Sequence, residues 1–204
     1  MELIAKPLRV GVVALQGGHR LHIALLEKLN AVGQAVRTPD DLANIDALII
    51  PGGESTTLSI LGRKSNLWDE VKRVANKGVP IMGTCAGLIM LSKAIDSNAE
   101  HIQPLRLIDV TVKRNAYGSQ VNSFEGTVEL ELNEKRSKIN GVFIRAPRIV
   151  EVGKQVEVVG TLLKEPVFVR QGNIWGLCFH PELSENTLIH REFLKLADSY
   201  RVNG

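Results

Sequence analysis

Short apolar runs alternate with helically spaced hydrophobic residues through the first half of the chain. Short runs rich in β-branched residues predict buried strands, whereas apolar residues three and four positions apart predict helices that bury one face. The expected strands are 9–15, 35–37, 47–50 and 79–82. The expected helices are 21–29, 67–76 and 86–94, with Gly33 and Gly78 as C-terminal stops of the first two.

The pattern changes after about residue 106, where strand candidates follow one another with turn residues between them. These candidates are 107–112, 126–132, 142–144, 156–163, 167–170 and 174–179, and an amphipathic helix over 186–199 follows. Strands that alternate with helices favour a parallel, doubly wound sheet. The sequence therefore predicts an α/β fold in one domain, 1–204. Its sheet is expected to be mostly parallel, with helices on both faces and mixed or antiparallel strands added in the C-terminal half.

Composition narrows the class of protein. A chain of 204 residues is long enough for one well-buried α/β domain and cramped for two. The net charge of +3 comes from scattered Lys and Arg, and aromatic residues make up only 4%, which argues against a nucleic-acid partner. The longest mostly apolar stretch, 79–91, is shorter than the ~18 residues of a membrane span. Two distant cysteines are too few for a disulfide framework or a structural zinc site, so we expect a cytoplasmic protein without a metal.

A cysteine framed by glycines is the strongest local motif. Gly83-Thr84-Cys85-Ala86-Gly87 lies between an expected strand and an expected helix and has the form of a nucleophile elbow. Such a turn strains the nucleophile's backbone, and small residues two places to either side avoid a clash. At the helix N-terminus, the dipole and free N–H groups favour a thiolate. The alternative is a buried cysteine in a glycine-rich turn; the functional interpretation makes Cys85 a nucleophile.

The second motif is His180-Pro181-Glu182, directly after the expected strand 174–179. Catalytic groups of open α/β sheets gather at the carboxyl ends of strands. We expect Pro181 to hold the segment extended, so that the side chains two positions apart project to the same side. Glu182 can then accept Nδ1–H of His180 and leave Nε2 free to act on a thiol. Alone this could be a surface histidine beside a glutamate, but with Cys85 it completes a constellation for acyl transfer.

A third motif, Pro51-Gly52-Gly53-Glu54-Ser55-Thr56, follows the strand 47–50. Adjacent glycines let the backbone approach a ligand and present N–H groups without side-chain obstruction. If this loop lies beside Cys85, the N–H groups of Gly53 and Ala86 can form an oxyanion hole. The alternatives are an ordinary turn or a weak phosphate loop, and the segment lacks the Gly-Lys-Ser/Thr ending of a P-loop.

Other polar residues give weaker signals. Cys178 lies within an apolar strand and reads as a packed core thiol rather than a second nucleophile. Arg114 and Arg145 can pair with a substrate carboxylate, although either can equally be a surface arginine. The remaining histidines show no obvious partners and receive no catalytic role: His19, His22, His101 and His190.

Taken in order, the motifs resemble a known family. The chain carries Gln16-Gly17, Pro51 to Thr56, Gly83 to Gly87, Arg114-Asn115, Phe143-Ile-Arg-Ala-Pro147 and Phe179-His-Pro-Glu-Leu183. The elbow and His-Pro-Glu are shared with class I glutamine amidotransferases generally. The other stretches are similar to the glutaminase subunits of two-component pyridoxal 5′-phosphate synthases, over about residues 9–200.

The resemblance implies an activity and a site. Cys85 would attack the carboxamide of L-glutamine, His180 would act as base and then acid, and Glu182 would orient His180. The residues implied to bind glutamine are Gly53, Glu54, Ser55, Arg114, Ile144 and Arg145. No cofactor is implied.

The resemblance also implies a partner. Ammonia would pass to a separate barrel-shaped synthase subunit that builds pyridoxal 5′-phosphate, with glutaminase subunits decorating a dodecameric synthase core. Two departures from the family pattern, Leu21 before His22 and Ser119 after Arg114-Asn115, leave the triad untouched but affect the expected docking. Two alternatives stay open: a glutaminase for another synthase, such as that of the histidine pathway, and a non-catalytic binding protein on the same scaffold.

Overall fold

The main sheet changes from parallel to antiparallel along its strand order, β2-β1-β3-β4-β12-β11-β10-β7-β8. The computed structural model describes residues 6–96, 101–114 and 123–203. The parallel half comprises β1 (Arg9–Val13), β2 (Val32–Val36), β3 (Ala47–Ile50), β4 (Ile81–Thr84) and β12 (Ile174–Leu177). The antiparallel half comprises β7 (Ser123–Leu132), β8 (Lys135–Ile144), β10 (Glu157–Leu162) and β11 (Glu165–Gln171).

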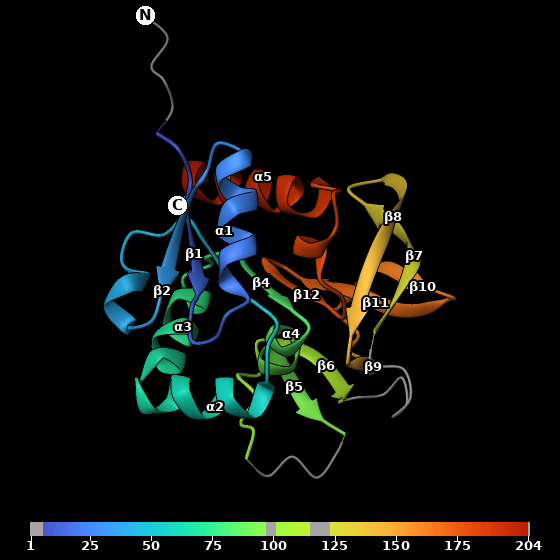
Figure 1. The fold of residues 1–204 in the computed structure, drawn as a ribbon, viewed down its shortest axis with the longest axis horizontal. Helices are drawn as coiled ribbons and strands as arrows, with labels where there is room; N and C mark the ends of the chain where they lie inside the picture. The colour runs from blue at the N-terminus through green and yellow to red at the C-terminus, as the bar shows by residue number, and fades with distance from the viewer. Residues whose placement is uncertain (1–5, 97–100, 115–122, 204) are drawn as a thin grey trace, which may run out of the picture.

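A smaller sheet, β5-β6-β9, lies beside the main one (Figure 1). Its strands are β5 (Ser92–Ile95), β6 (Ile108–Lys113) and β9 (Arg148–Val152). The α-helices are α1 (His19–Lys28), α2 (Ser55–Lys64), α3 (Leu67–Asn76), α4 (Ala86–Leu91) and α5 (Leu188–Asn203). Two short 3₁₀ helices are η1 (Pro39–Leu42) and η2 (Pro181–Leu183).

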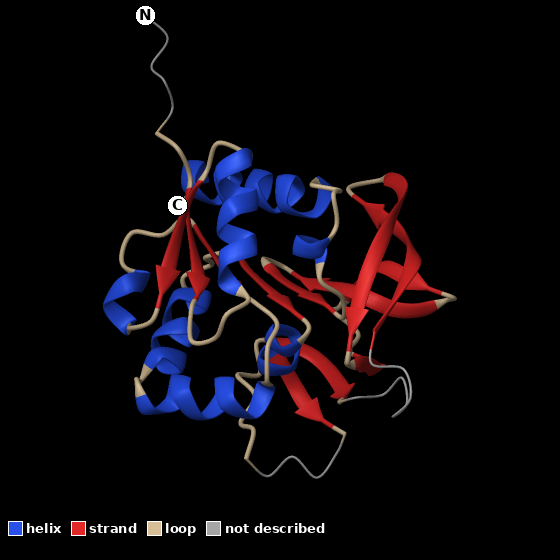
Figure 2. Cartoon of the chain, in the orientation of Figure 1, coloured by secondary structure: helices blue, strands red, loops and turns tan. Residues whose placement is uncertain are grey.

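Helices cover both faces of the parallel half. Neighbouring residues of a strand point to opposite faces, and on β12 the ring of Trp175 meets Phe193 of α5 while Gly176 faces Leu88 of α4. Figure 2 shows the helices gathered around the parallel half, whereas β7, β8, β10 and β11 extend away from them. The predicted α/β class, with a parallel sheet and antiparallel additions, is confirmed.

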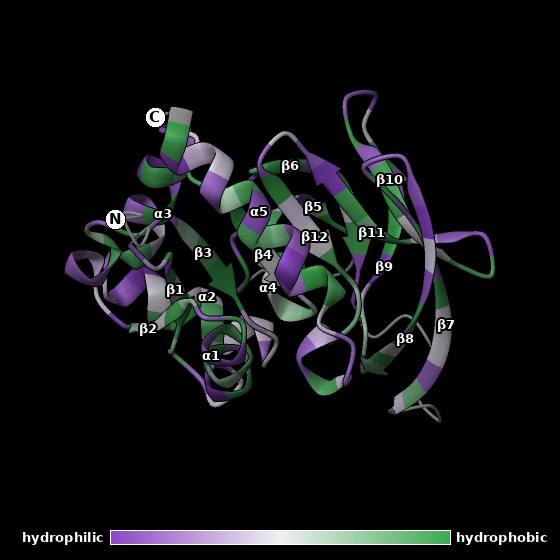
Figure 3. Cartoon of the chain, turned by 90° about the horizontal axis from the view of Figure 1, so that it is seen from above, coloured by the Kyte–Doolittle hydropathy of each residue, from purple (hydrophilic) through white to green (hydrophobic). Residues whose placement is uncertain are grey.

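The strand pattern along the sequence reflects this burial. Every residue of β3, β4 and β12 is buried, which explains why these strands read as continuous apolar runs. β7 instead alternates buried and exposed positions toward its end, as a strand with one solvated face does. In Figure 3, β3 carries the green of hydrophobic residues at the centre of the fold.

Several element boundaries match the predictions, but the helix stop at Gly33 and the end of the helix over 86–94 do not. The strand 47–50 and the helix 67–76 have the bounds expected from the sequence. Gly33 does not stop the first helix but lies within β2, where an added Cβ would stand 3.0 Å from Cα of Ile23 in α1. The glycine is therefore required by close helix–strand packing rather than by a helix end.

The expected helix over 86–94 ends early. α4 stops at Leu91, where the Ser92 hydroxyl donates to the carbonyl of Ile89 at 2.8 Å, and residues 92–95 pair with β6 as β5. The patterns also leave out α2 and β9 altogether. No helix in the described ranges is long and apolar enough to cross a bilayer.

Gly87 of α4 packs directly against β3, and this contact gives a stability prediction. A Cβ at this position would overlap the carbonyl oxygen of Ile50 in β3, which is backbone and cannot rotate away. We expect Gly87→Ala to lower the free energy of unfolding by about 1–3 kcal/mol, measured by urea denaturation. Gly17→Ala is the matched control, because a Cβ there meets nothing within 4 Å. Equal unfolding midpoints for the two variants would contradict the close helix–strand contact.

Candidate active site

The register of three parallel strands brings the sequence motifs together. Ile50 of β3 pairs with Gly83 of β4, and Thr84 at the end of β4 pairs with Leu177 of β12. The segments that leave these strands, Pro51–Gly53, Cys85 and 178–180, therefore emerge at one edge of the sheet. This is the carboxyl edge, where open α/β sheets place their ligands.

Cys85 occupies a strained turn between β4 and α4. Its backbone has φ 50° and ψ −106°, a conformation that residues with a side chain rarely adopt and that is found at functional sites. The backbone N–H of Cys85 donates to the carbonyl of Leu177 at 2.8 Å, which fixes the turn to β12. An added Cβ on Gly83 would come within 2.6 Å of the carbonyl carbon of Gly87. The geometry is that of the predicted elbow, with Cys85 at the N-terminus of α4.

The side chains of His180 and Glu182 contact one another as predicted, but the backbone that carries them has a different conformation from the predicted one. Nδ1 of His180 lies 2.7 Å from Oε1 of Glu182. The prediction of an extended segment is wrong, since residues 181–183 form the 3₁₀ helix η2. Pro181 stands at the first position of η2, where its missing N–H costs no hydrogen bond. The N–H of His180 donates to the carbonyl of Val142 in β8 at 2.8 Å, which ties the motif to the antiparallel half.

The electrostatics of this cluster favour an imidazolium beside a carboxylate. Burial alone would lower the pKa of His180, but hydrogen bonding with Cys85 and Glu182, together with their charges, raises that pKa to about 10. Burial would raise the pKa of Glu182, but the charge of His22 and the hydrogen bond with His180 hold it well below its usual range. An imidazolium held next to Cys85 stabilises the thiolate form that attacks a carbonyl.

Cys178 has the opposite environment. Its side chain is fully buried in the core, and its backbone N–H donates to the carbonyl of Val167 at 2.9 Å. Burial, together with the nearby Cys85, raises the pKa of the Cys178 thiol far above its usual range. This environment is that of the packed core thiol expected from the sequence.

A cavity of about 170 Å³ opens between Cys85 and His180. It lies below the ~300–1,000 Å³ of sites for drug-sized ligands, which suits a small metabolite. The structure brings to its wall all the expected oxyanion and glutamine-binding residues, together with Ile89: Gly53, Glu54, Ser55, Cys85, Ala86, Ile89, Arg114, Ile144, Arg145 and His180. Ile89 went unrecognised in the sequence, although it lies one helical turn after Cys85. Asn115 and Ser119 lie outside the described residues.

The loop over 51–54 is fastened on two sides. The N–H of Gly52 donates to the buried hydroxyl of Thr84 at 3.1 Å. The side-chain amide of Gln16 brackets the backbone of Glu54, accepting from its N–H at 2.7 Å and donating to its carbonyl at 2.8 Å. A Cβ on Gly52 would overlap Cε1 of His180, so glycine is needed where the loop passes the imidazole.

Glu54 is both a wall of the cavity and the N-cap of α2. Its carboxylate accepts from the N–H groups of Thr56 and Thr57, and lies 3.5 Å from Nη2 of Arg114. Burial would raise the pKa of Glu54, but the hydrogen bonds from Thr57 and Thr56 lower it below its usual value. A carboxylate and a guanidinium therefore face each other at the rim, a pairing suited to the two charged groups of an amino acid.

Two histidines to which the sequence assigns no partners lie directly behind the triad. Nε2 of His22 is 3.3 Å from Oε2 of Glu182, and Nδ1 of His22 is 2.9 Å from Nε2 of His190. Both histidines therefore have partners that the sequence pattern does not reveal. Helical spacing places His22 on the buried face with Leu25 and Leu26, a signal that it points inward. Its partner 168 residues away has no sequence signature.

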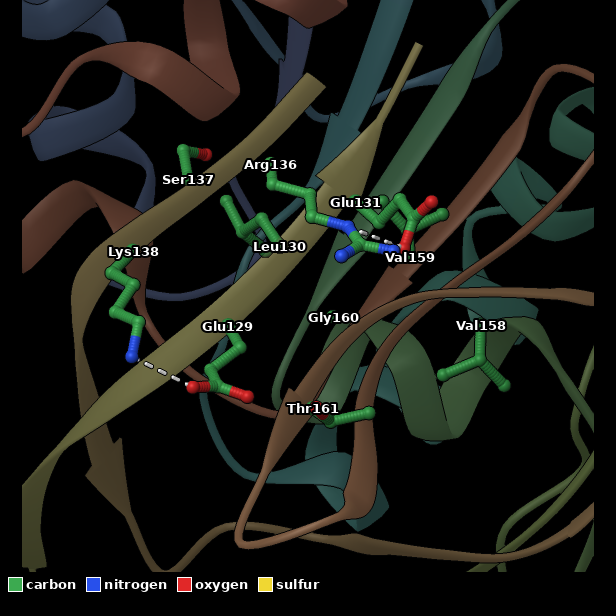
Figure 4. A pocket seen from close by; sticks show the side chains of 10 residues that line it. All are labelled: Glu129, Leu130, Glu131, Arg136, Ser137, Lys138, Val158, Val159, Gly160 and Thr161. Atoms are coloured by element: carbon green, nitrogen blue, oxygen red, sulfur yellow. Dashed lines mark ion pairs between the residues drawn. The ribbon is translucent and has the colours of Figure 1, made fainter. Parts of the chain in front are cut away.

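A larger hollow of about 480 Å³ lies elsewhere, on β7, β8 and β10 (Figure 4). Its charged side chains are paired across the strands, Lys138 with Glu129 and Arg136 with Glu131. No cysteine or histidine lines it, so the smaller cavity is the one with reactive groups. Within the described residues, no group of three or more His, Cys, Asp and Glu side chains is arranged to hold a metal ion.

Comparisons with known proteins agree with this geometry. The SNO glutamine amidotransferase family model matches residues 12–198. Pyridoxal 5′-phosphate synthase subunit PdxT of Thermosipho africanus is 44% identical over 189 residues, covering 93% of this chain and 98% of that protein. The protein of the same name from Thermococcus onnurineus is 47% identical over 197 residues, covering 93% and 99%.

A solved structure, described as a crystal structure of glutamine amidotransferase, has the same fold. It superposes with a TM-score of 0.87 at 43% identity, and the match covers 93% of this chain and 98% of that one. The family match extends over most of the chain, from the second half of β1 into α5. These matches confirm the resemblance that the ordered motifs indicated. The chain belongs to the SNO glutamine amidotransferase family.

Proposed function

We propose that this protein hydrolyses L-glutamine to L-glutamate and ammonia, with Cys85, His180 and Glu182 as its catalytic triad. The observation that carries the proposal is the convergence of a strained cysteine and a carboxylate-bound imidazole on one small cavity. A cysteine beside a histidine that a third group orients is the arrangement of a thiol acyl-transfer enzyme. The intact triad argues against a non-catalytic binding protein.

The reaction follows from the positions of these groups. The Cys85 thiolate attacks the carboxamide carbon, and the resulting oxyanion is held by the N–H groups of Gly53 and Ala86. His180, as imidazolium, donates its proton to the leaving nitrogen, so that ammonia departs and a glutamyl thioester remains. His180 then removes a proton from water, which attacks the thioester and releases glutamate and the thiolate.

The remaining residues of the cavity bind the amino-acid end of glutamine. Gly53, Glu54 and Ser55 line the cavity from the start of α2, while Ile144, the last residue of β8, and Arg145, which follows it, line it from the antiparallel half. The guanidinium groups of Arg114 and Arg145 are the expected partners of the substrate carboxylate, because their planar forks match it. Ile89 supplies an apolar surface for the methylene groups of the substrate.

We further propose a partner that consumes the ammonia. Relatives named as subunits of pyridoxal 5′-phosphate synthase match this chain over 98–99% of their own length. A separate synthase subunit is therefore the expected acceptor, in a complex with a dodecameric synthase core carrying twelve glutaminase subunits. Because a catalytic thiol must stay reduced, we propose a cytoplasmic location. We also propose that residues 1–204 form one glutaminase domain, since the family match extends over 12–198.

Replacing the nucleophile tests the activity directly. Cys85→Ala is expected to reduce kcat for glutamine hydrolysis by at least ~10³-fold without unfolding the protein, because no other thiol faces the cavity. Cys178→Ala is the control and should retain most activity, because Cys178 is buried away from the cavity. A glutamine-like diazoketone should label Cys85 and spare Cys178, as read by mass spectrometry of peptides. Labelling at Cys178 instead would overturn the assignment.

Replacing the base tests the role of His180. His180→Asn is expected to lower kcat by ~10²–10⁴-fold, because proton transfer to the leaving ammonia is lost. Glu182→Gln should cost less, since the imidazole remains and only its orientation and charge stabilisation suffer. Steady-state rates at saturating glutamine measure both effects. Near-normal turnover in His180→Asn would require a different base.

The fastened loop over 51–54 generates a prediction about the partner. Gly52 and Gly53 carry no side chain, so the peptide between them can rotate at little steric cost. The bonds that hold the loop lie on either side of this peptide, at the N–H of Gly52 and at Glu54. We expect the isolated chain to be weakly active and the synthase subunit to raise the rate about a hundredfold, for which ~3 kcal/mol of differential binding suffices. The measurement is glutaminase rate against added synthase subunit, with Cys85→Ala as the background control. If the isolated chain already hydrolysed glutamine at its maximal rate, and a synthase subunit shown to bind left that rate unchanged, activation by the synthase would be excluded.

A further inference from the structure

A buried chain of polar groups continues from the triad into the protein. Behind Glu182 stand His22 on α1 and His190 on α5, and neither histidine exposes any surface. The contacts run from Oε2 of Glu182 to Nε2 of His22 at 3.3 Å, and from Nδ1 of His22 to Nε2 of His190 at 2.9 Å. We propose that His22, whose ring is held in place by His190, is a positioning residue that keeps the Glu182 carboxylate turned toward His180.

The cluster has a cost that packing alone does not explain. Burying an imidazole removes its hydrogen bonds to water, and a leucine of similar size would avoid that loss. Within residues 6–96, 101–114 and 123–203, Nδ1 of His190 finds no hydrogen-bond partner. Nε2 of His22 and Oε2 of Glu182 form no well-directed hydrogen bond either, so their approach at 3.3 Å is an electrostatic contact. Two imidazoles that are buried with unsatisfied polar atoms beside a triad carboxylate point to a role in the reaction.

The direction of the hydrogen atoms follows from the carboxylate. Glu182 has only lone pairs to offer, so both nitrogens that face it must carry hydrogen: Nδ1 of His180 and Nε2 of His22. On its other side, Nδ1 of His22 lies 2.9 Å from Nε2 of His190, so one hydrogen is shared between the two rings. His190 is suited to remain neutral, because burial and the neighbouring His22 lower its pKa to about 3. One hydrogen therefore lies between the two histidine rings, and another lies on the nitrogen of His22 that faces Glu182.

This ordered chain restrains a torsion that is otherwise soft. The carboxylate of a glutamate rotates with little preference about its last bond. His180 holds Oε1 at 2.7 Å, and His22 faces the other oxygen, so rotation would break both contacts. The groups that face Glu182 are His180 from its own segment and His22 from α1, with Cys85 and His190 one step further away. Without His22, no polar group would face the buried Oε2, and the carboxylate would rotate or take a proton.

The inference rests on the proposed glutamine hydrolysis, and kcat, KM and pH profile test it in the full-length protein. His22→Leu is expected to lower kcat by on the order of ten- to a hundredfold with little change in KM, as loss of outer partners of catalytic histidines does. The acid limb of the pH profile should move to higher pH, because an unsupported Glu182 protonates more readily. His190→Leu should shift the same quantities less, since it removes the contact that holds the ring of His22 but leaves that ring beside Glu182.

Rescue separates positioning from packing. His22→Gln places an amide N–H at about the position of Nε2 and should retain most of kcat and the wild-type pH profile. Leu26→Ala, one turn along α1 at a fully buried position, is the matched structural control and should lower the melting temperature without moving the profile. If His22→Leu left the profile in place, or Leu26→Ala moved it equally, the positioning role would be overturned.

A second measurement is independent of glutamine. The rate at which iodoacetamide alkylates Cys85 reports thiolate formation, and Cys178 is too buried to contribute. The pH midpoint of alkylation should rise in His22→Leu and stay unchanged in His22→Gln, because the imidazolium of His180 loses its fixed carboxylate only in the former. An unchanged or lower midpoint in His22→Leu would refute the inference. The predicted alkylation shift without any hydrolysis of glutamine would refute the proposed function and leave the positioning role standing.

Discussion

The parallel pairing of β4 with its neighbours β3 and β12 is the constraint on which the site depends. It fixes the level at which each strand ends, so that segments from residues 51, 85 and 180 meet without any direct link along the chain. All three strands are buried on both faces, so a slip in register would disrupt close packing on each face as well as separate the motifs. Stability and site geometry are therefore specified by the same pairing.

Most of the fold and of the triad could be predicted from the sequence because their signals are local. Leu67–Asn76 has helical spacing and a following glycine, and β3 is a single apolar run. The elbow around Cys85 is recognisable because backbone strain restricts which residues can stand beside it. A single sequence is enough to predict an element or a site when neighbouring residues alone determine its structure.

The errors occur where distant contacts determine the structure. Gly33 looks like a helix stop, but Ile23 of α1 packs so closely against it that any side chain would be crowded. Residues 92–95 continue a helical pattern, yet pairing with β6 makes them a strand. His22 and His190 gain their partners only when the fold brings α1 and α5 together behind η2. None of these contacts leaves a mark in the neighbouring sequence.

The double role of Glu54 limits how the site can change during evolution. Its carboxylate caps the N-terminus of α2 by accepting from the N–H groups of Thr56 and Thr57, and the same residue forms part of the cavity wall. A substitution that reshaped the cavity at this position would also leave the first N–H groups of α2 without an acceptor. New substrate specificity at residue 54 is therefore accessible mainly through side chains that can still cap a helix, such as aspartate, asparagine or serine. The need to cap α2 therefore restricts which side chains can evolve at the cavity wall beside Cys85.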